Sequence, residues 1–170
     1  MTDFINDPDA QNLHFGRNEE KTQELQSQER YREFKQWLDD NGVINPSVEY
    51  PVCFGKSGQL VGMGALRDIP PMTAFLYIPQ ELLINRDNIR IRSPHIEKLF
   101  IDHPEVFIEH IDAEYLQLIL FIMHEQMKGK DSFFYPYLQI VNRSDLPFLW
   151  EESEIKEFQD AVLQSNIEFY

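Results

Sequence analysis

The segment 112–128 constrains the fold most, because it predicts a helix with almost no polar face. Its central residues, 118–123, are all apolar. Asp112 is typical of a helix start, and the Gly129 that follows is typical of a helix end. A helix that is apolar on most sides is buried inside a globular protein, and this apolar run is far too short to span a bilayer. We therefore expect this helix to be the most deeply buried element, with Ile119 inside the core.

The other periodic segments predict an α+β fold. Amphipathic spacing predicts helices at about 18–41, from Ser93-Pro94 to His103, and at roughly 151–163. Short apolar runs on either side of a turn at 55–58 predict an antiparallel hairpin. A third strand and a single helical turn follow it. The two hairpin strands, the third strand and the turn are expected at 48–54, 59–66, 73–78 and 80–84.

Length and composition predict one folded domain after an N-terminal arm. The chain has 170 residues, of which 42% are hydrophobic, which is enough for one core. Residues 1–17 mix acids and amides with no sustained period, so we expect a flexible acidic arm. Residues 18–170 then form the domain, with a helix and strands in 18–84 and a mostly helical part in 85–170.

Charge and cysteine content narrow the classes of partner. The net charge is −14, so the surface repels nucleic acid and anionic membranes, and we expect a protein partner instead. Cys53 is the only cysteine and can form neither an internal disulfide nor a cysteine-rich metal site. We therefore expect an intracellular protein, cytoplasmic by default, with an organelle also possible if the chain belongs to an assembly there.

Two separated blocks of sequence resemble the SET domain of the Rubisco large-subunit and actin-histidine methyltransferase branch. The first block spans 62–69 and 75–84, and the second spans 132–138 with Pro147 and Trp150. The resemblance covers about residues 34–158. It implies the first SET strands followed by the helical insert of those enzymes, and so the N-terminal half of a SET domain.

The resemblance also implies a place for the cofactor S-adenosylmethionine. In the family this cofactor lies against a Glu-Gly-x-Gly backbone at the hairpin, where glycine permits close approach. Counting back from Arg67 places Gln59, Leu60, Val61 and Gly62 at those positions, so only the second glycine is kept. A register shifted by two residues instead uses Gly62, Met63 and Gly64. The candidate cofactor-binding residues are Gln59, Val61, Gly62, Met63 and Gly64.

The family's other functional residues find no match. Members carry an Asn-His pair and a late tyrosine, but the sequence contains no Asn-His dipeptide, and Tyr170 lacks the required context. We therefore assign no catalytic residue and expect no cofactor unless a partner completes the site. The favoured hypothesis is a non-catalytic SET-like subunit that docks into an assembly. The alternative is the N-terminal half of a protein lysine or histidine methyltransferase, inactive alone and completed by a second chain or by further sequence.

Two further motifs have a functional and a structural interpretation. His124-Glu125 begins like a helical zinc motif, but Lys128 stands where the second histidine is needed, so we predict no metal site. An aromatic cluster could bind a partner, for example as a cage for a cationic side chain, although such clusters more often pack in a core. Its members are Phe133, Phe134, Tyr135 and Tyr137.

Overall fold

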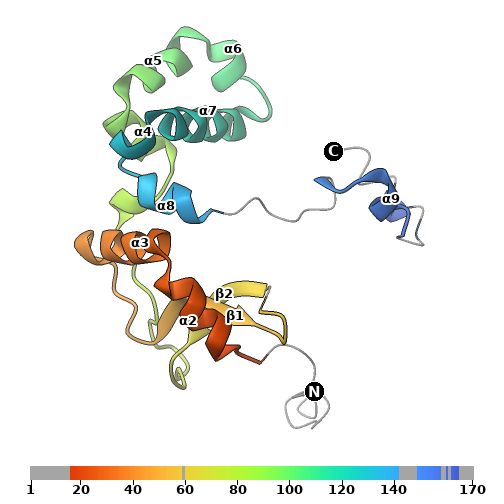
Figure 1. The fold of residues 1–170 in the computed structure, drawn as a ribbon. Helices are drawn as coiled ribbons and strands as arrows, with labels where there is room; N and C mark the ends of the chain where they lie inside the picture. The colour runs from red at the N-terminus through yellow and green to blue at the C-terminus, as the bar shows by residue number, and fades with distance from the viewer. Residues whose placement is uncertain (1–15, 59, 142–148, 158–159, 161, 165–170) are drawn as a thin grey trace. The chain divides into compact units, whose positions relative to one another are not determined.

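The computed structural model describes residues 16–58, 60–141, 149–157, 160 and 162–164. The chain divides into two units, Met1–Ile140 and Val141–Tyr170. The first combines a hairpin with many helices, which confirms the α+β class (Figure 1). Its elements are α2 (Glu19–Ser27), α3 (Glu29–Asp40), β1 (Val48–Phe54), β2 (Leu60–Ala65), η1 (Gln80–Leu82), α4 (Arg86–Arg92), α5 (Pro94–Asp102), α6 (Pro104–Phe107), α7 (Ala113–Lys128), η2 (Gly129–Asp131) and α8 (Tyr135–Ile140).

The second unit contains α9 (Glu152–Ile155), which begins where the last predicted helix begins. Part of that predicted helix, and almost all of the predicted arm 1–17, lie outside the described residues. In the described part of the chain, no helix combines the length and the apolar character that a membrane span requires.

Two helices replace the single helix predicted at 18–41. Asn18 caps α2, because its side chain accepts a hydrogen bond from the N–H of Lys21 at 3.0 Å. Gln28 is extended, with φ −67° and ψ 140°, and separates α2 from α3. Trp37 of α3 packs against the core. Gln28 is neither glycine nor proline, so the sequence does not indicate that the helix ends there.

The predicted hairpin is confirmed. β1 and β2 pair antiparallel, with Cys53 opposite Val61, and the register shifts at an irregularity between Glu49 and Val52. Gly58 in the connecting turn has φ +66°, a conformation that suits glycine. A Cβ at this glycine would also lie 2.7 Å from the side chain of an α2 lysine, so the turn sits closely against α2.

The strand predicted at 73–78 is wrong. This segment forms a single bridge, in which the N–H groups of Ile44 and Tyr77 each donate to the other's carbonyl at 3.0 and 2.8 Å. The side chains of Phe75 and Tyr77 are 46% and 58% exposed. A β-strand needs a paired neighbour along its length, and among the described residues this segment is paired only at Ile44.

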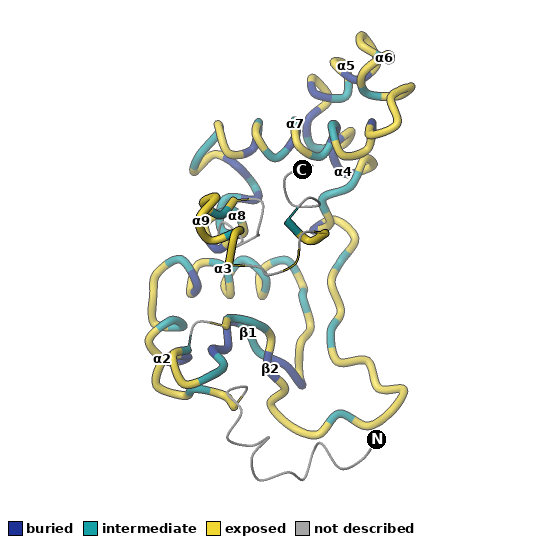
Figure 2. The backbone as a smooth tube through the Cα atoms, turned by 90° about the vertical axis from the view of Figure 1, so that its right-hand side faces the viewer, coloured by how far each residue is buried: buried dark blue, intermediate teal, exposed yellow. Residues whose placement is uncertain are grey.

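The core of the first unit lies among α4, α5, α7 and α8 (Figures 1 and 2). α4, which the sequence did not predict, is capped by Asn85, whose side chain accepts from the N–H of Asn88 at 3.0 Å. Pro94 occupies the first turn of α5, as expected. The buried residues of this core are Ile89, Ile96, Phe100, Phe121 and Phe134.

α7 confirms the predicted helix but not its predicted burial. Ile119 is 53% exposed and Met123 is 54% exposed, whereas Phe121 is 1% exposed. The prediction that α7 is the most buried element, with Ile119 inside the core, is therefore wrong. The reason is that Gln117 and Glu125 form hydrogen bonds with residues outside α7 or at its end, and these bonds hold their side of the helix toward the core.

Candidate functional site

The predicted cofactor segment lies on β2. Val61, Gly62, Met63 and Gly64 are consecutive residues of this strand, while Gln59 lies outside the described residues. Val61 and Gly62 are half-buried, Met63 is 47% exposed and Gly64 is buried. The structure thus brings these candidates onto one strand next to the turn, as the sequence predicts.

The two glycines of β2 differ in what packing demands of them. At Gly64 an added Cβ would lie 2.8 Å from Cγ2 of Val52, which is fully buried and cannot move aside easily. At Gly62 an added Cβ would meet only Cε2 of Phe54, at an ordinary 3.5 Å. Packing therefore requires glycine at Gly64 but not at Gly62. At Gly62, the missing side chain would instead allow a ligand to approach the backbone closely.

The outer edge of β1 is closed by α2. The N–H of Cys53 donates to Oγ1 of Thr22 at 3.0 Å, and its carbonyl accepts from the N–H of Asn18 at 2.8 Å. Further along, Nε2 of Gln26 donates to the carbonyl of Pro51 at 2.9 Å. Thr22 is fully buried at this contact. The helix therefore takes the place of a neighbouring strand on this side of the hairpin.

Among the described residues, nothing pairs with the outer edge of β2. In an antiparallel pair, two residues directly opposite each other direct their backbone N–H and C=O groups either both toward or both away from the other strand, and the two cases alternate along the strand. Cys53 directs its groups outward to α2, so the backbone groups of its partner Val61 also point outward, as do those of Met63 and Ala65. Their N–H and C=O groups face away from β1. Beside them, the side chains of Leu60 and Leu66 are 56% and 54% exposed. An edge with free backbone groups and apolar side chains is suited to pairing with another polypeptide segment.

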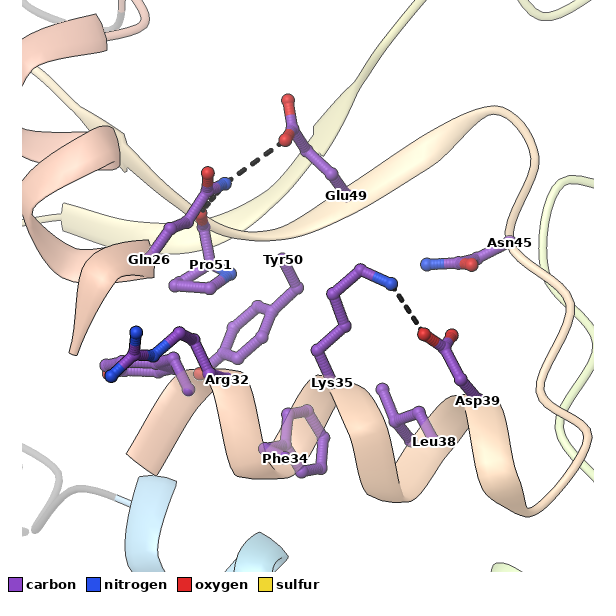
Figure 3. A pocket seen from close by; sticks show the side chains of 11 residues that line it. Gln26, Arg32, Phe34, Lys35, Leu38, Asp39, Asn45, Glu49, Tyr50 and Pro51 are labelled. Atoms are coloured by element: carbon purple, nitrogen blue, oxygen red, sulfur yellow. Dashed lines mark hydrogen bonds and ion pairs between the residues drawn. The ribbon is translucent and has the colours of Figure 1, made fainter. Parts of the chain in front are cut away.

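A pocket of about 280 Å³ lies between α3 and β1 (Figure 3). Its lower side is aromatic and apolar, with Phe34 and Leu38 from α3 and Tyr50 from β1 (Figure 3). Polar and charged side chains surround this apolar floor. They come from α2, α3, β1 and the loop before β1, and include Gln26, Arg32, Lys35, Asp39, Asn45 and Glu49.

The carboxylates of this pocket are already paired. Nζ of Lys35 lies 2.6 Å from Oδ2 of Asp39. Glu49 forms an ion pair with Arg17 and accepts a hydrogen bond from Nε2 of Gln26 at 3.1 Å. Paired carboxylates are poor general bases, since their charge is already stabilised. The arrangement therefore suits binding rather than proton transfer.

Two tyrosines line the same pocket. Their rings meet edge-to-face with centroids 6.1 Å apart. Tyr31 is 3% exposed, and its buried hydroxyl has no hydrogen-bond partner among the described residues. Burial raises the pKa of Tyr50, so this phenol stays protonated. A bound group with a hydrogen-bond acceptor would satisfy the Tyr31 hydroxyl.

The aromatic cluster divides between core and surface. Phe134 is 1% exposed and packs on Phe121, and Phe133 lies edge-on to Trp37 with centroids 5.5 Å apart. Tyr135 is half-buried. Tyr137 is 36% exposed and lines a second, apolar groove of about 410 Å³ between α3 and residues 78–84. Of the candidate partner-binding residues, Tyr137 is thus the most available to a partner.

The histidines and acidic residues form no metal centre in the described part of the chain, where no three such side chains gather. His124 instead pairs with His95, their Nε2 atoms 2.9 Å apart. Burial, and then the positive charges of His95 and Lys128, lower the pKa of His124. The pair joins α5 to α7.

Comparison with known proteins gives one distant relative. No family model matches the sequence, and no solved structure matches it. The chain is similar to the chloroplastic ribulose-1,5-bisphosphate carboxylase/oxygenase large subunit N-methyltransferase of Pisum sativum, with 28% identity over 134 residues. The match includes 76% of this chain and 24% of the relative. The chain therefore spans about a quarter of the length of the methyltransferase that it matches.

The sequence did not predict the pocket between α3 and β1. Tyr31 lies on α3 and meets Glu49 and Tyr50 of β1 only when α3 packs on the hairpin. The one available signal was that Tyr31 falls on the same side of its helix as Phe34 and Leu38. Nothing in the spacing indicated that this side would face a strand.

Proposed function

We propose that this chain forms the N-terminal part of an S-adenosylmethionine-dependent protein methyltransferase of the SET type. In this proposal the β1–β2 hairpin is one wall of the cofactor site. The acceptor is a lysine or histidine side chain of a protein substrate. The remaining walls come from polypeptide outside the matched residues, on the same chain or on another.

The main support for this proposal is the sequence similarity to a methyltransferase. A contiguous match to 76% of the chain must include both the hairpin and the helices from α4 to α7, wherever its ends lie. A short shared motif would not extend across two such different structural regions. The likeness is to an enzyme, and nothing in the structure or the comparisons supports the non-catalytic docking subunit that the sequence favoured.

The open edge of β2 supports the proposed incompleteness. α2 closes β1, but the outward backbone groups of Val61, Met63 and Ala65 have no strand beside them among the described residues. The match includes only 24% of the relative, so the rest of a protein of that length has ample polypeptide to cover such an edge. The proposal therefore predicts that further polypeptide pairs here and closes the cofactor site.

The hairpin residues fit a cofactor in part. Gly62 has no packing reason to be glycine, and the backbone groups on either side of it are available to hydrogen-bond a ligand. Leu60 departs from the family glycine, and its side chain is 56% exposed, so it does not block the turn by burial. The cofactor supplies the methyl group, and this wall would hold it through main-chain contacts.

Nuclear magnetic resonance of the ¹⁵N-labelled chain tests the proposal. Titration with S-adenosylmethionine should shift the amide signals of Val61, Gly62 and Met63 selectively, with millimolar affinity because only one wall is present. Gly62→Ala should reduce the shifts, while Gly16→Ala, where an added Cβ meets nothing within 4 Å, should not. The absence of any shift on β2, or equal shifts in both variants, would contradict the proposal.

A further inference from the structure

The pocket between α3 and β1 contains a buried hydrogen-bond donor that its neighbours do not satisfy. Tyr31 lines the pocket and is 3% exposed, and its buried hydroxyl has no hydrogen-bond partner among the described residues. Burying a hydroxyl without a partner costs free energy, so buried hydroxyls in native proteins normally have one. The pocket is therefore suited to a ligand that brings a hydrogen-bond acceptor to Tyr31.

The two carboxylates that line the pocket are already engaged by the chain. Asp39 accepts a hydrogen bond from Nζ of Lys35 at 2.6 Å (Figure 3). Glu49 accepts from Nε2 of Gln26 at 3.1 Å and forms an ion pair with Arg17. Their negative charge is thus neutralised locally, which favours a ligand with acceptor groups over a cationic ligand.

Two arginines give this part of an acidic chain a local positive charge. Arg32 lines the pocket, and the guanidinium of Arg30 lies over the Tyr31 ring, 4.9 Å from its centroid. In the part of the chain that the structure describes, neither arginine forms an ion pair, and Arg30 donates only to the neutral side chain of Gln28. A guanidinium can donate two parallel hydrogen bonds to one carboxylate, so Arg32 is suited to bind that group.

The floor of the pocket determines the rest of the ligand. Phe34 and Tyr50 meet edge-to-face with centroids 6.1 Å apart, and Leu38 and Pro51 continue this apolar surface. The volume of about 280 Å³ is at the small end for ligand pockets. The pocket therefore has room for one ring or one branched aliphatic group.

We propose that this pocket binds a small apolar carboxylate, in which a single ring or branched chain carries the carboxylate group. The apolar body lies on the floor, and the carboxylate accepts hydrogen bonds from the Tyr31 hydroxyl and from Arg32. A free organic acid and the carboxyl terminus of a peptide with an apolar last residue present the same chemistry. No residue of β2 lines the pocket, so this site is separate from the proposed cofactor wall.

Nuclear magnetic resonance titration of the whole ¹⁵N-labelled chain with phenylacetate tests the site. The amide signals of Tyr31, Arg32 and Tyr50 should shift. Phenylacetamide has the same shape without the charge and should bind at least about tenfold more weakly, because it loses the charge-assisted hydrogen bonds. No shift at these amides, or equal affinity for the acid and its amide, would overturn the proposal.

Two variants test the assigned donors. Arg32→Gln should weaken phenylacetate binding about tenfold, whereas Arg90→Gln, at an exposed arginine of α4, should leave it unchanged. An Arg32→Gln variant that binds as tightly as the parent would overturn the site.

Tyr31→Phe separates a ligand-binding hydroxyl from a structural one. The variant should bind phenylacetate several-fold more weakly, yet its melting temperature should stay the same or rise, because the substitution removes a hydroxyl that has no partner. Tyr115→Phe, at a tyrosine 71% exposed, is the matched control and should change neither quantity. A lower melting temperature with unchanged affinity would show that the hydroxyl serves the fold and would overturn its role in binding.

A peptide distinguishes the two sources of the carboxylate. If the natural ligand is a peptide terminus, Gly-Gly-Phe with a free carboxyl group should bind more tightly than phenylacetate, and amidation of its terminus should abolish the gain. If the natural ligand is a free acid, phenylacetate should bind more tightly than the peptide. Binding of the free and the amidated peptide with equal affinity would contradict recognition of a carboxylate.

Discussion

Replacing Glu125 with Gln should destabilise the chain by about 3 kcal/mol at neutral pH, as expected when one partner of a buried ion pair is removed. Glu125 is 2% exposed. Its carboxylate accepts from Nζ of Lys128 at 2.6 Å and from Oγ of Ser132 at 2.5 Å. Oγ of Ser132 in turn accepts from the N–H of Phe134 at 3.0 Å. The substitution therefore disturbs the network that connects α7 to the start of α8.

The effect should depend on pH in a defined direction. Burial raises the pKa of Glu125, but hydrogen bonds from Lys128 and Ser132 outweigh it and leave the pKa below its ordinary value. A carboxyl group with a lowered pKa in the folded state stabilises the fold above its ordinary pKa, which is about 4.3 for Glu. The stability difference between the parent and Glu125→Gln should therefore be constant near pH 7. It should shrink as the pH falls below about 4.3 toward the folded-state value.

Urea denaturation at fixed chain concentration, followed by circular dichroism between pH 7 and pH 3, measures both quantities. Glu114→Gln is the matched control, because it makes the same change at an exposed residue in the first turn of the same helix. It should cost no more than about 1 kcal/mol. If Glu125→Gln costs no more than this control at pH 7, or if its effect does not shrink in acid, the buried network does not stabilise the fold as we infer.

Two further substitutions test the hairpin. Thr22→Val should cost about 1–3 kcal/mol, because it leaves the buried N–H of Cys53 without an acceptor, whereas Ser27→Ala at an exposed hydroxyl should cost much less; equal costs by urea denaturation would refute the closed edge. Gly64→Ala should cost about 1–3 kcal/mol through overlap with Val52, whereas Gly62→Ala should be nearly neutral. Equal melting temperatures for the two glycine variants would show that β2 does not pack as described.

The hairpin was predictable because its signals are local. Glycines at 55 and 58 stand between two short apolar runs, and both strands form where these runs occur. The strand predicted at 73–78 was also an apolar run, but in the described part of the chain it pairs only at Ile44. Pairing is not a property of one segment, so composition alone could not distinguish the two cases.

The orientation of α7 was not predictable from its own residues. Apolar side chains lie on both sides of this helix, so periodicity could not select the buried one. The choice depends on distant partners, since Gln117 donates to the carbonyl of Phe107 and Glu125 accepts from Ser132. The break at Gln28 likewise carries no glycine or proline signal.

The position of the candidate cofactor residues 61–64 on β2 was predictable to the same extent as the hairpin, whereas their role stays a prediction. Val61 to Gly64 fall on β2 beside the turn, where the resemblance placed them. The sequence could not show that Gly64 serves packing against Val52 while Gly62 does not, because that distinction depends on the distance between strands. Nor could it show that α2 closes one edge of the hairpin, while the other edge has no partner in the described part of the chain.

Cross-linking of radiolabelled S-adenosylmethionine tests the central claim most directly. The chain, tagged and isolated from its own cells with whatever polypeptide accompanies it, is irradiated with [methyl-³H]S-adenosylmethionine and digested with trypsin. Cleavage after Lys56 and Arg67 releases peptide 57–67, which contains every candidate cofactor residue. We predict that this peptide carries the label and that excess S-adenosylhomocysteine removes it. Label elsewhere on the chain, or none, would contradict the assignment of the hairpin as a wall of the cofactor site.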